Sequence, residues 1–242
     1  MEIKSYTVGP FAENTYLISE EGSVILIDPG FFDPGEFQLF QNELKESGKI
    51  LIAVLLTHAH VDHVLGLERV LKEFDVPVYL NHSDLNLWNN FPDQAMRFGF
   101  RAAGFDFTPK KLDEQKNFKI GPFTMDVLYT PGHSPDHVSL YFSENGILIA
   151  GDALFRESIG RTDLYKGDFD LLASSIREKL YTLPDDTKVF PGHGPSTTIA
   201  HEKKKKRFCE TTPGVALPVP GIQLLSVPFS AIFCWSLKIC SS

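Results

Sequence analysis

The first half of the chain alternates between two hydrophobic patterns. Short runs rich in Val, Ile and Leu indicate strands, and apolar residues that recur every three or four positions indicate helices. Phe37, Phe40 and Leu44, for example, fall on one face of a helix that Gly48 would end. The strands predicted in this way are 14–18, 23–28, 50–56 and 76–80, and the helices are 36–47 and 64–74.

The second half repeats the combination of strand pairs and a helix. A hairpin is predicted across 143–145, and Asp168 is a candidate N-cap because its carboxylate can accept the free amide hydrogens of a first helical turn. Two halves of this kind predict two packed sheets with helices outside them. The predicted strands are 123–128, 138–142, 146–150 and 188–190, and the helix is 169–180.

Side chains that can bind metal gather directly after the predicted strand 50–56. Three imidazoles and one carboxylate lie close together, on His58, His60, Asp62 and His63. In an extended segment His58 and His60 point the same way, whereas Asp62 falls at the start of the next helix, where it can face a second position. Imidazole and carboxylate without thiolate are the ligand types of a catalytic zinc site, and they also suit iron or manganese.

Three further candidates stand at later strand ends, each in a turn rich in Gly or Pro. They are His133, Asp152 and His193. Loops that a rigid sheet holds at strand ends are where binding residues tend to lie. If these ends meet at one edge, the distant residues complete two coordination spheres, and the Asp152 carboxylate can join two metals into one site.

Composition and charge narrow the class of protein. The 242-residue chain is 43% hydrophobic, which is enough for a full core, and its net charge of −8 argues against a general nucleic-acid binder. No run reaches the ~18 apolar residues of a membrane span, and the first residues lack an apolar signal core. We therefore expect a cytoplasmic protein that acts on a small molecule, without nucleic-acid or membrane partners.

The end of the chain differs from the rest. Residues 208–242 hold all three cysteines and only two charged residues, Glu210 and Lys238, and they follow a basic run at 203–207. We predict a catalytic domain over 1–207 and an atypical, poorly ordered tail over 208–242. A change of reading frame within the lysine codons of the basic run would explain this contrast.

The candidate ligands resemble the hallmarks of the metallo-β-lactamase superfamily. These stand here as Asp28, His-Ala-His-Val-Asp-His at 58–63, His133, Asp152 and His193. The segment 151–164 further resembles the compact glyoxalase II-like hydrolases. The resemblance covers about residues 2–204 and implies an α/β fold, a four-layer αβ/βα sandwich of two mixed sheets flanked by helices.

The resemblance also implies a two-metal site, with two zinc ions expected and iron or manganese as alternatives. The two coordination spheres would be His58, His60 and His133 for the first metal, Asp62, His63 and His193 for the second, and Asp152 as a bridge. Catalysis would depend on Asp62 and Asp152. A water whose pKa the metals lower to ~7 would lose its proton and attack a thioester carbonyl, as in S-2-hydroxyacylglutathione.

Other residues are expected to support this site. Asp28 would hydrogen-bond the ligand loop rather than bind metal, and His137 would have a similar supporting role. Arg161 is the candidate for substrate binding. It matches a position where glyoxalase II relatives carry a cation for the glutathione carboxylate, and arginine suits bidentate carboxylate contact. An ion pair of Arg161 with Asp163 or Asp168 is the alternative.

Other functions stay open at this point. Nothing after Thr198 resembles the helical C-terminal domain that supplies more of the glutathione site in full-length glyoxalase II. A mononuclear iron persulfide dioxygenase carries a motif like Gly-Arg-Thr-Asp at 160–163, and it would use only His58, His133 and Asp152 as ligands. β-Lactam hydrolysis would predict an export signal. A degenerate metal-binding module is the alternative that is not an enzyme.

Overall fold

A computed structural model describes residues 1–205, and the tail predicted over 208–242 lies outside the described residues. Two sheets form the centre of the described part. The first contains β1 (Glu2–Val8), β2 (Glu13–Glu20), β3 (Ser23–Ile27), β4 (Ile50–Leu55), β5 (Val78–Leu80) and β6 (Lys110–Lys111), in that spatial order. The first three strands are antiparallel, and β3 to β6 pair in parallel.

The second sheet has six strands in the order β14-β13-β10-β9-β8-β7. Its strands are β7 (Gln115–Ile120), β8 (Phe123–Tyr129), β9 (Val138–Phe142), β10 (Ile147–Gly151), β13 (Lys188–Pro191) and β14 (Thr197–Thr198). Only the β10–β13 pair is parallel among the pairs of this sheet. A separate short hairpin joins β11 (Leu154–Phe155) to β12 (Ser158–Ile159).

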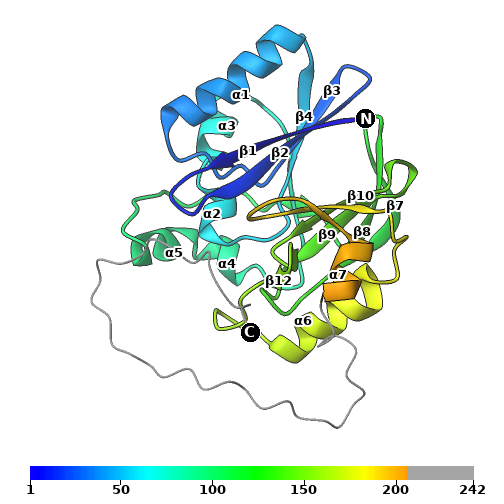
Figure 1. The fold of residues 1–242 in the computed structure, drawn as a ribbon. Helices are drawn as coiled ribbons and strands as arrows, with labels where there is room; N and C mark the ends of the chain where they lie inside the picture. Colours follow the sequence, from blue (N-terminus) through cyan, green and yellow to red (C-terminus); the bar gives the residue numbers. More distant parts are fainter. Residues whose placement is uncertain (206–242) are drawn as a thin grey trace, which may run out of the picture. The chain divides into compact units, whose positions relative to one another are not determined.

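Helices flank both sheets, as Figure 1 shows with α1 and α3 beside the first sheet and α6 beside the second. The helices are α1 (Pro34–Ser47), α2 (Val61–Val64), α3 (Leu67–Glu73), α4 (Asn86–Asn89), α5 (Phe91–Arg97), α6 (Phe169–Ser175) and α7 (Ile199–Lys205). The 3₁₀ turn η1 (Ser143–Asn145) and the π-helical turn η2 (Ile176–Leu180) complete the described elements. Among residues 1–205, no helix combines the length and apolar character needed to cross a membrane.

Three apolar layers hold the sheets and helices together. Successive side chains of a strand point to opposite faces, so on β2 Leu17 packs toward the helices and Ile18 toward the other sheet. On β10, Leu148 packs toward α6, and Ile149 joins Ile18 in the layer between the sheets. The order helix, sheet, sheet, helix is the four-layer αβ/βα sandwich, and it confirms the predicted fold class.

Most predicted elements are present, but the predicted helix 64–74 is two helices. The helical turn already begins at Val61, and the chain breaks at Gly66 before α3. A Cβ at Gly66 would lie 2.7 Å from the Phe31 nitrogen and 2.8 Å from the Pro29 oxygen, so the backbone at this position packs directly on the loop after β3. The turn that carries Asp62 and His63 is therefore a short helix of its own, α2.

Several elements were not predicted from the sequence. They are β1, β6, β7, β11, β12, β14, α4 and α5. The strands β1 and β7 are largely exposed edge strands, with mostly polar residues, so they lack the continuous apolar runs that mark buried strands. The helix predicted over 169–180 is α6 followed by the π-helical turn, and the predicted N-cap Asp168 accepts a hydrogen bond from the Leu171 nitrogen.

Candidate metal centre

The expected ligands stand on loops that follow strands of both sheets. The cluster 58–63 follows β4, His133 follows β8, Asp152 follows β10 and His193 follows β13. Parallel pairing of β3 with β4, and of β10 with β13, brings the carboxyl ends of each pair to one edge. Because the sheets face each other, loops from both contribute to one cluster of side chains.

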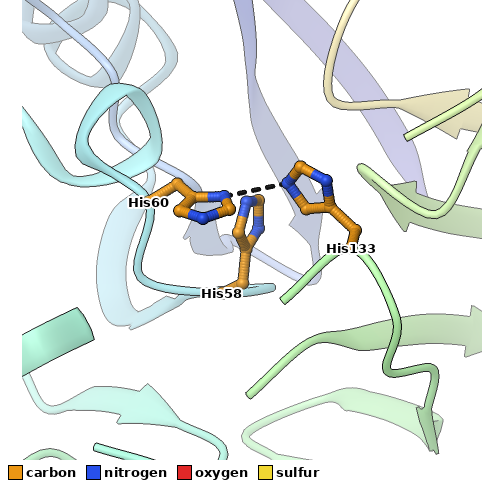
Figure 2. A group of neighbouring side chains, drawn as sticks. All are labelled: His58, His60 and His133. Carbon is orange, nitrogen blue, oxygen red and sulfur yellow. Dashed lines mark hydrogen bonds between the residues drawn. The ribbon is translucent and has the colours of Figure 1, made fainter. Parts of the chain in front are cut away.

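Figure 2 shows His58, His60 and His133 with their imidazole rings turned toward one another. One nitrogen from each ring lies within 4.8 Å of the other two, and all three side chains are buried. The His60 Nδ1 and His133 Nε2 atoms are 2.8 Å apart. Three imidazoles at such distances, which we call the first ligand group, can hold one metal ion.

Asp62, His63 and His193 form a second ligand group of the same kind. Their ligand atoms also lie within 4.8 Å of one another. The Asp62 Oδ2 atom is 3.1 Å from His193 Nε2 and 3.9 Å from His63 Nε2. His63 is fully buried, whereas Asp62 and His193 are partly exposed, so this group stands nearer to solvent than the first.

The Asp152 carboxylate lies between the two groups. Its Oδ1 atom is 3.5 Å from His63 Nε2, and its Oδ2 atom is 3.5 Å from both His133 Nε2 and His193 Nε2. His58, His63 and Asp152 form a third set, and their ligand atoms lie within 4.8 Å of one another. One carboxylate thus faces imidazoles of both ligand groups, which is the position that a bridging ligand requires.

Several buried polar atoms of the cluster lack a hydrogen-bond partner within residues 1–205. They are His58 Nε2, His63 Nδ1, His63 Nε2 and Asp152 Oδ1. An unsatisfied buried polar group costs about 1–3 kcal/mol, so a concentration of them indicates an occupant that the protein atoms alone do not provide. The donor set of imidazole nitrogens and carboxylate oxygens fits a divalent ion such as zinc, iron or manganese.

The two groups differ in their electrostatics. Burial and the neighbouring imidazoles lower the pKa of His58 well below its usual value and that of His60 to about 3. Burial has the same effect on His63, but the carboxylates of Asp152 and Asp62 outweigh it and raise the pKa of His63 well above its usual value. The first group is therefore neutral, whereas the second holds protons that a metal would displace.

Asp28 and His137 contact the ligand loops by hydrogen bonds. The Asp28 carboxylate accepts from the Thr57 nitrogen and hydroxyl, each at 2.7 Å, and lies 3.1 Å from His63 Nδ1. His137 Nε2 accepts from the Asp152 nitrogen at 2.9 Å. These contacts tie Asp28 to the loop before His58 and His137 to the backbone of Asp152, and the supporting role of both residues stays a prediction.

Glycines let the backbone pass close to the bridging carboxylate. A Cβ at Gly192 would lie 2.1 Å from Asp152 Oδ1 and 2.8 Å from His63 Cε1. Gly151 has a φ of +51°, and a Cβ there would lie 2.6 Å from His137 Nε2. A side chain at either position would displace atoms of the cluster.

Two buried carboxylates beside the cluster were not identified from the sequence. Asp136 accepts from the Ala59 nitrogen at 2.9 Å and thereby holds the ligand loop, and burial raises its pKa to about 7. Glu13 Oε1 lies 3.9 Å from His63 Nδ1, and Glu13 joins Asp28 and His63 in a set with ligand atoms within 4.8 Å. Of these two carboxylates, only Asp136 could have been suspected from the sequence, because it lies in the turn between His133 and His137.

The Arg161 side chain does not reach toward the cluster. It is 60% exposed and forms two contacts of 2.7 Å with the Asp163 carboxylate, which is the ion pair named above as the alternative. The Arg161 carbonyl instead lies 2.8 Å from His133 Nδ1 and orients that imidazole. The expected role of Arg161 in substrate binding is not tested by these contacts.

The remaining histidines lie outside the cluster. His82 Nε2 is 2.8 Å from the Pro109 carbonyl, and His201 Nε2 is 2.9 Å from Glu157 Oε1 on the β11–β12 hairpin. Both side chains are partly exposed. The structure therefore brings together all seven predicted ligands and leaves these two histidines in contacts of their own.

The chain is similar to proteins that are named as hydrolases. A probable metallo-hydrolase of Bacillus subtilis, YqgX, is 38% identical over 212 residues, which are 86% of this chain and 97% of the relative. The hydroxyacylglutathione hydrolase GloC of Haemophilus influenzae is 36% identical over 212 residues, which are 86% of this chain and 98% of the relative.

Solved structures agree with these relatives. The B3 metallo-β-lactamase BLEG-1 superposes with a TM-score of 0.79 at 36% identity, over 87% of this chain and 100% of its own. TTHA1623, solved in a di-iron-bound form, superposes with a TM-score of 0.75 at 37% identity, over 85% of this chain and 99% of its own. The likeness thus covers the sheets, the helices and the loops that carry the ligand groups.

A family model agrees with the fold and with the cluster of ligand-type side chains. The model described as the metallo-beta-lactamase superfamily matches residues 8–193, a span that includes the loops of both ligand groups. This chain therefore belongs to the metallo-β-lactamase superfamily.

Proposed function

We propose that this protein is a dinuclear metal-dependent hydrolase that cleaves thioesters such as S-2-hydroxyacylglutathione. Its family and its metallo-hydrolase relatives support metal-dependent hydrolysis. One observation carries the dinuclear assignment: the Asp152 carboxylate lies 3.5 Å from imidazoles of both ligand groups. The relative named hydroxyacylglutathione hydrolase supports the thioester substrate.

The first ligand group would hold one metal, the second ligand group the other, and Asp152 would bind both. Two zinc ions are the proposed cofactors, and iron or manganese would suit the same ligands. When bound, such ions lower the pKa of a water to ~7 and polarise a carbonyl oxygen. The protein supplies the ligands, their orientation and a cluster in which most side chains are buried.

The carboxylates of Asp62 and Asp152 are the residues on which catalysis is proposed to depend. Asp62 is partly exposed and lies 3.1 Å from His193 Nε2, so it stands where substrate and water can reach the site. Burial opposes ionisation of Asp62, but His63 and His193 outweigh it and lower its pKa to about 2. Asp62 is thus ionised at neutral pH and can orient a water by accepting its hydrogen.

Other side chains keep the ligands in place or meet the substrate. Asp28 would hold the ligand loop through its hydrogen bonds with Thr57 and lies 3.1 Å from His63 Nδ1, and His137 would hold Asp152 through a hydrogen bond. Arg161 is proposed to bind a substrate carboxylate by exchanging its exposed ion pair with Asp163 for that contact. Such an exchange costs little, because an exposed ion pair contributes only about 0–1 kcal/mol.

The persulfide dioxygenase alternative differs in metal content. It would use His58, His133 and Asp152 for a single iron, and it would leave Asp62 and His193 without a ligand role. The second ligand group, with its ligand atoms within 4.8 Å, favours the dinuclear hydrolase.

Metal analysis combined with an assay is the most informative test of this proposal. We expect the purified protein to bind two divalent ions per chain and to hydrolyse S-lactoylglutathione, with a β-lactam and a persulfide assayed alongside. One iron per chain with oxygen uptake on the persulfide would favour the dioxygenase instead. Inactivity of metal-loaded protein on all three substrates would favour a module that binds metal without catalysis.

The substitution Asp62→Ala should abolish hydrolysis, with a loss of more than about 100-fold, since even partners outside the ligand set cost 10–100-fold. The metal content should fall at the same time, because the second ligand group loses its only carboxylate apart from the bridge. Asp93→Ala on α5, an exposed residue, is the control and should change neither quantity. Full metal content and activity in Asp62→Ala would contradict the two-metal site.

Acid should remove one metal before the other. In the metal-free protein burial opposes protonation, but carboxylates raise the pKa of His63 and His193, whereas His60 has a pKa of about 3. Protons therefore compete with metal at the second ligand group first. As pH falls, the metal content after dialysis should pass from two to one per chain. Loss of both metals in a single step would contradict this order.

A further inference from the structure

Asn14, at the start of β2, holds the loop that carries His193. The Asn14 nitrogen donates to the Gly192 carbonyl at 2.7 Å. Its side-chain Nδ2 donates to the carbonyls of Pro191 at 3.1 Å and Gly194 at 2.8 Å. Three hydrogen bonds from one residue of the first sheet thus bracket His193, which stands on the second sheet.

Tyr16 reinforces the same contact from the same face of β2. Its hydroxyl donates to the Pro191 carbonyl at 2.6 Å, and its ring packs edge-on against Phe190 with centroids 5.8 Å apart. Glu13 and His193 also form an isolated antiparallel β-bridge. The start of β2 is therefore paired with the His193 loop by backbone and by side chains.

The opposite face of β2 supports another ligand of the second group. Thr15 Oγ1 lies 2.7 Å from the Asp28 carbonyl and accepts from the Gly30 nitrogen at 3.0 Å. It thereby fixes the loop on which Asp28 stands, and the Asp28 carboxylate lies 3.1 Å from His63 Nδ1. Neighbouring residues of a strand point to opposite faces, so Asn14 and Thr15 reach different loops.

The residue type at position 14 suits this role. Asparagine is depleted in strands, and a buried carboxamide is costly unless its groups are hydrogen-bonded. Asn14 is 5% exposed, and its Nδ2 uses both hydrogens on the two loop carbonyls while Oδ1 accepts from Thr7 Oγ1 at 3.0 Å. An aspartate or a leucine of similar size could not donate to either carbonyl.

We propose that the start of β2, from Glu13 to Tyr16, positions the second ligand group, and that Asn14 is its main positioning residue. The proposal rests on the two-metal function proposed above and adds a specific element to it. Both faces of this segment lead to ligands of the second group, one to His193 and one to His63. Loss of these contacts should therefore weaken the second metal more than the first.

The test is a cobalt(II) titration of metal-free protein, followed by visible absorption and by competition with a chelator. For Asn14→Ala we expect the affinity for the first cobalt to be retained and that for the second to fall about 10–100-fold, the range found for residues that orient ligands. Asn14→Asp, which keeps the size of the side chain and the acceptor for Thr7, should show the same selective loss.

Asn42→Ala on the exposed face of α1 is the matched control, because it makes the same change of side chain away from the ligand loops. It should bind both cobalt ions as the unmodified protein does. Tyr16→Phe loses a single hydroxyl and keeps its ring. If the Asn14 variants fail to fold, this variant still tests whether the start of β2 positions the second ligand group. It should weaken the second ion alone, by a smaller factor.

The outcomes separate this proposal from the function on which it rests. Unchanged affinities in the Asn14 and Tyr16 variants, or equal loss of both ions, would overturn the positioning role while the dinuclear site stood. Binding of a single cobalt by the unmodified protein would overturn the dinuclear site, and the positioning of a second metal would fall with it.

Discussion

A single buried carboxylate, that of Asp152, faces imidazoles on loops from both sheets at 3.5 Å. Burying an unpaired charge is costly, and Asp152 is compensated by several histidines rather than by a lysine or arginine. Its position depends on Gly151 in a left-handed conformation, on the His137 hydrogen bond and on the bare backbone of Gly192. This carboxylate lies between the two ligand groups and faces imidazoles of both.

Both sheets contribute loops to the cluster around Asp152. The first sheet supplies the loop after β4, with candidate ligands for both groups, and the second supplies the candidates His133, Asp152 and His193. The apolar layer between the sheets fixes their separation. Asn14 and Tyr16 of β2, in the first sheet, donate hydrogen bonds to the His193 loop of the second sheet. The histidines of the first group have lowered pKa values and those of the second group raised ones, so protons compete with metal more strongly at the second group.

The seven ligand candidates could be named from the sequence because their signals are local. His58, His60 and Asp62 are close in the chain, and a histidine or aspartate after a strand is visible from the apolar run before it. The contacts of Asn14 with Pro191 and of Asp136 with Ala59 join residues far apart in the chain, so no spacing predicts them. The break at Gly66 was also missed, and there the backbone packs on a loop more than thirty residues earlier, to which the Gly66 nitrogen donates at Pro29.

The most direct test of the two-metal account is anomalous scattering from crystals of the metal-loaded protein, measured at the absorption edge of the metal. The account predicts two peaks, one within the first ligand group and one within the second, with Asp152 oxygens bound to both. A single peak held by His58, His133 and Asp152, with Asp62 and His193 turned away, would contradict it.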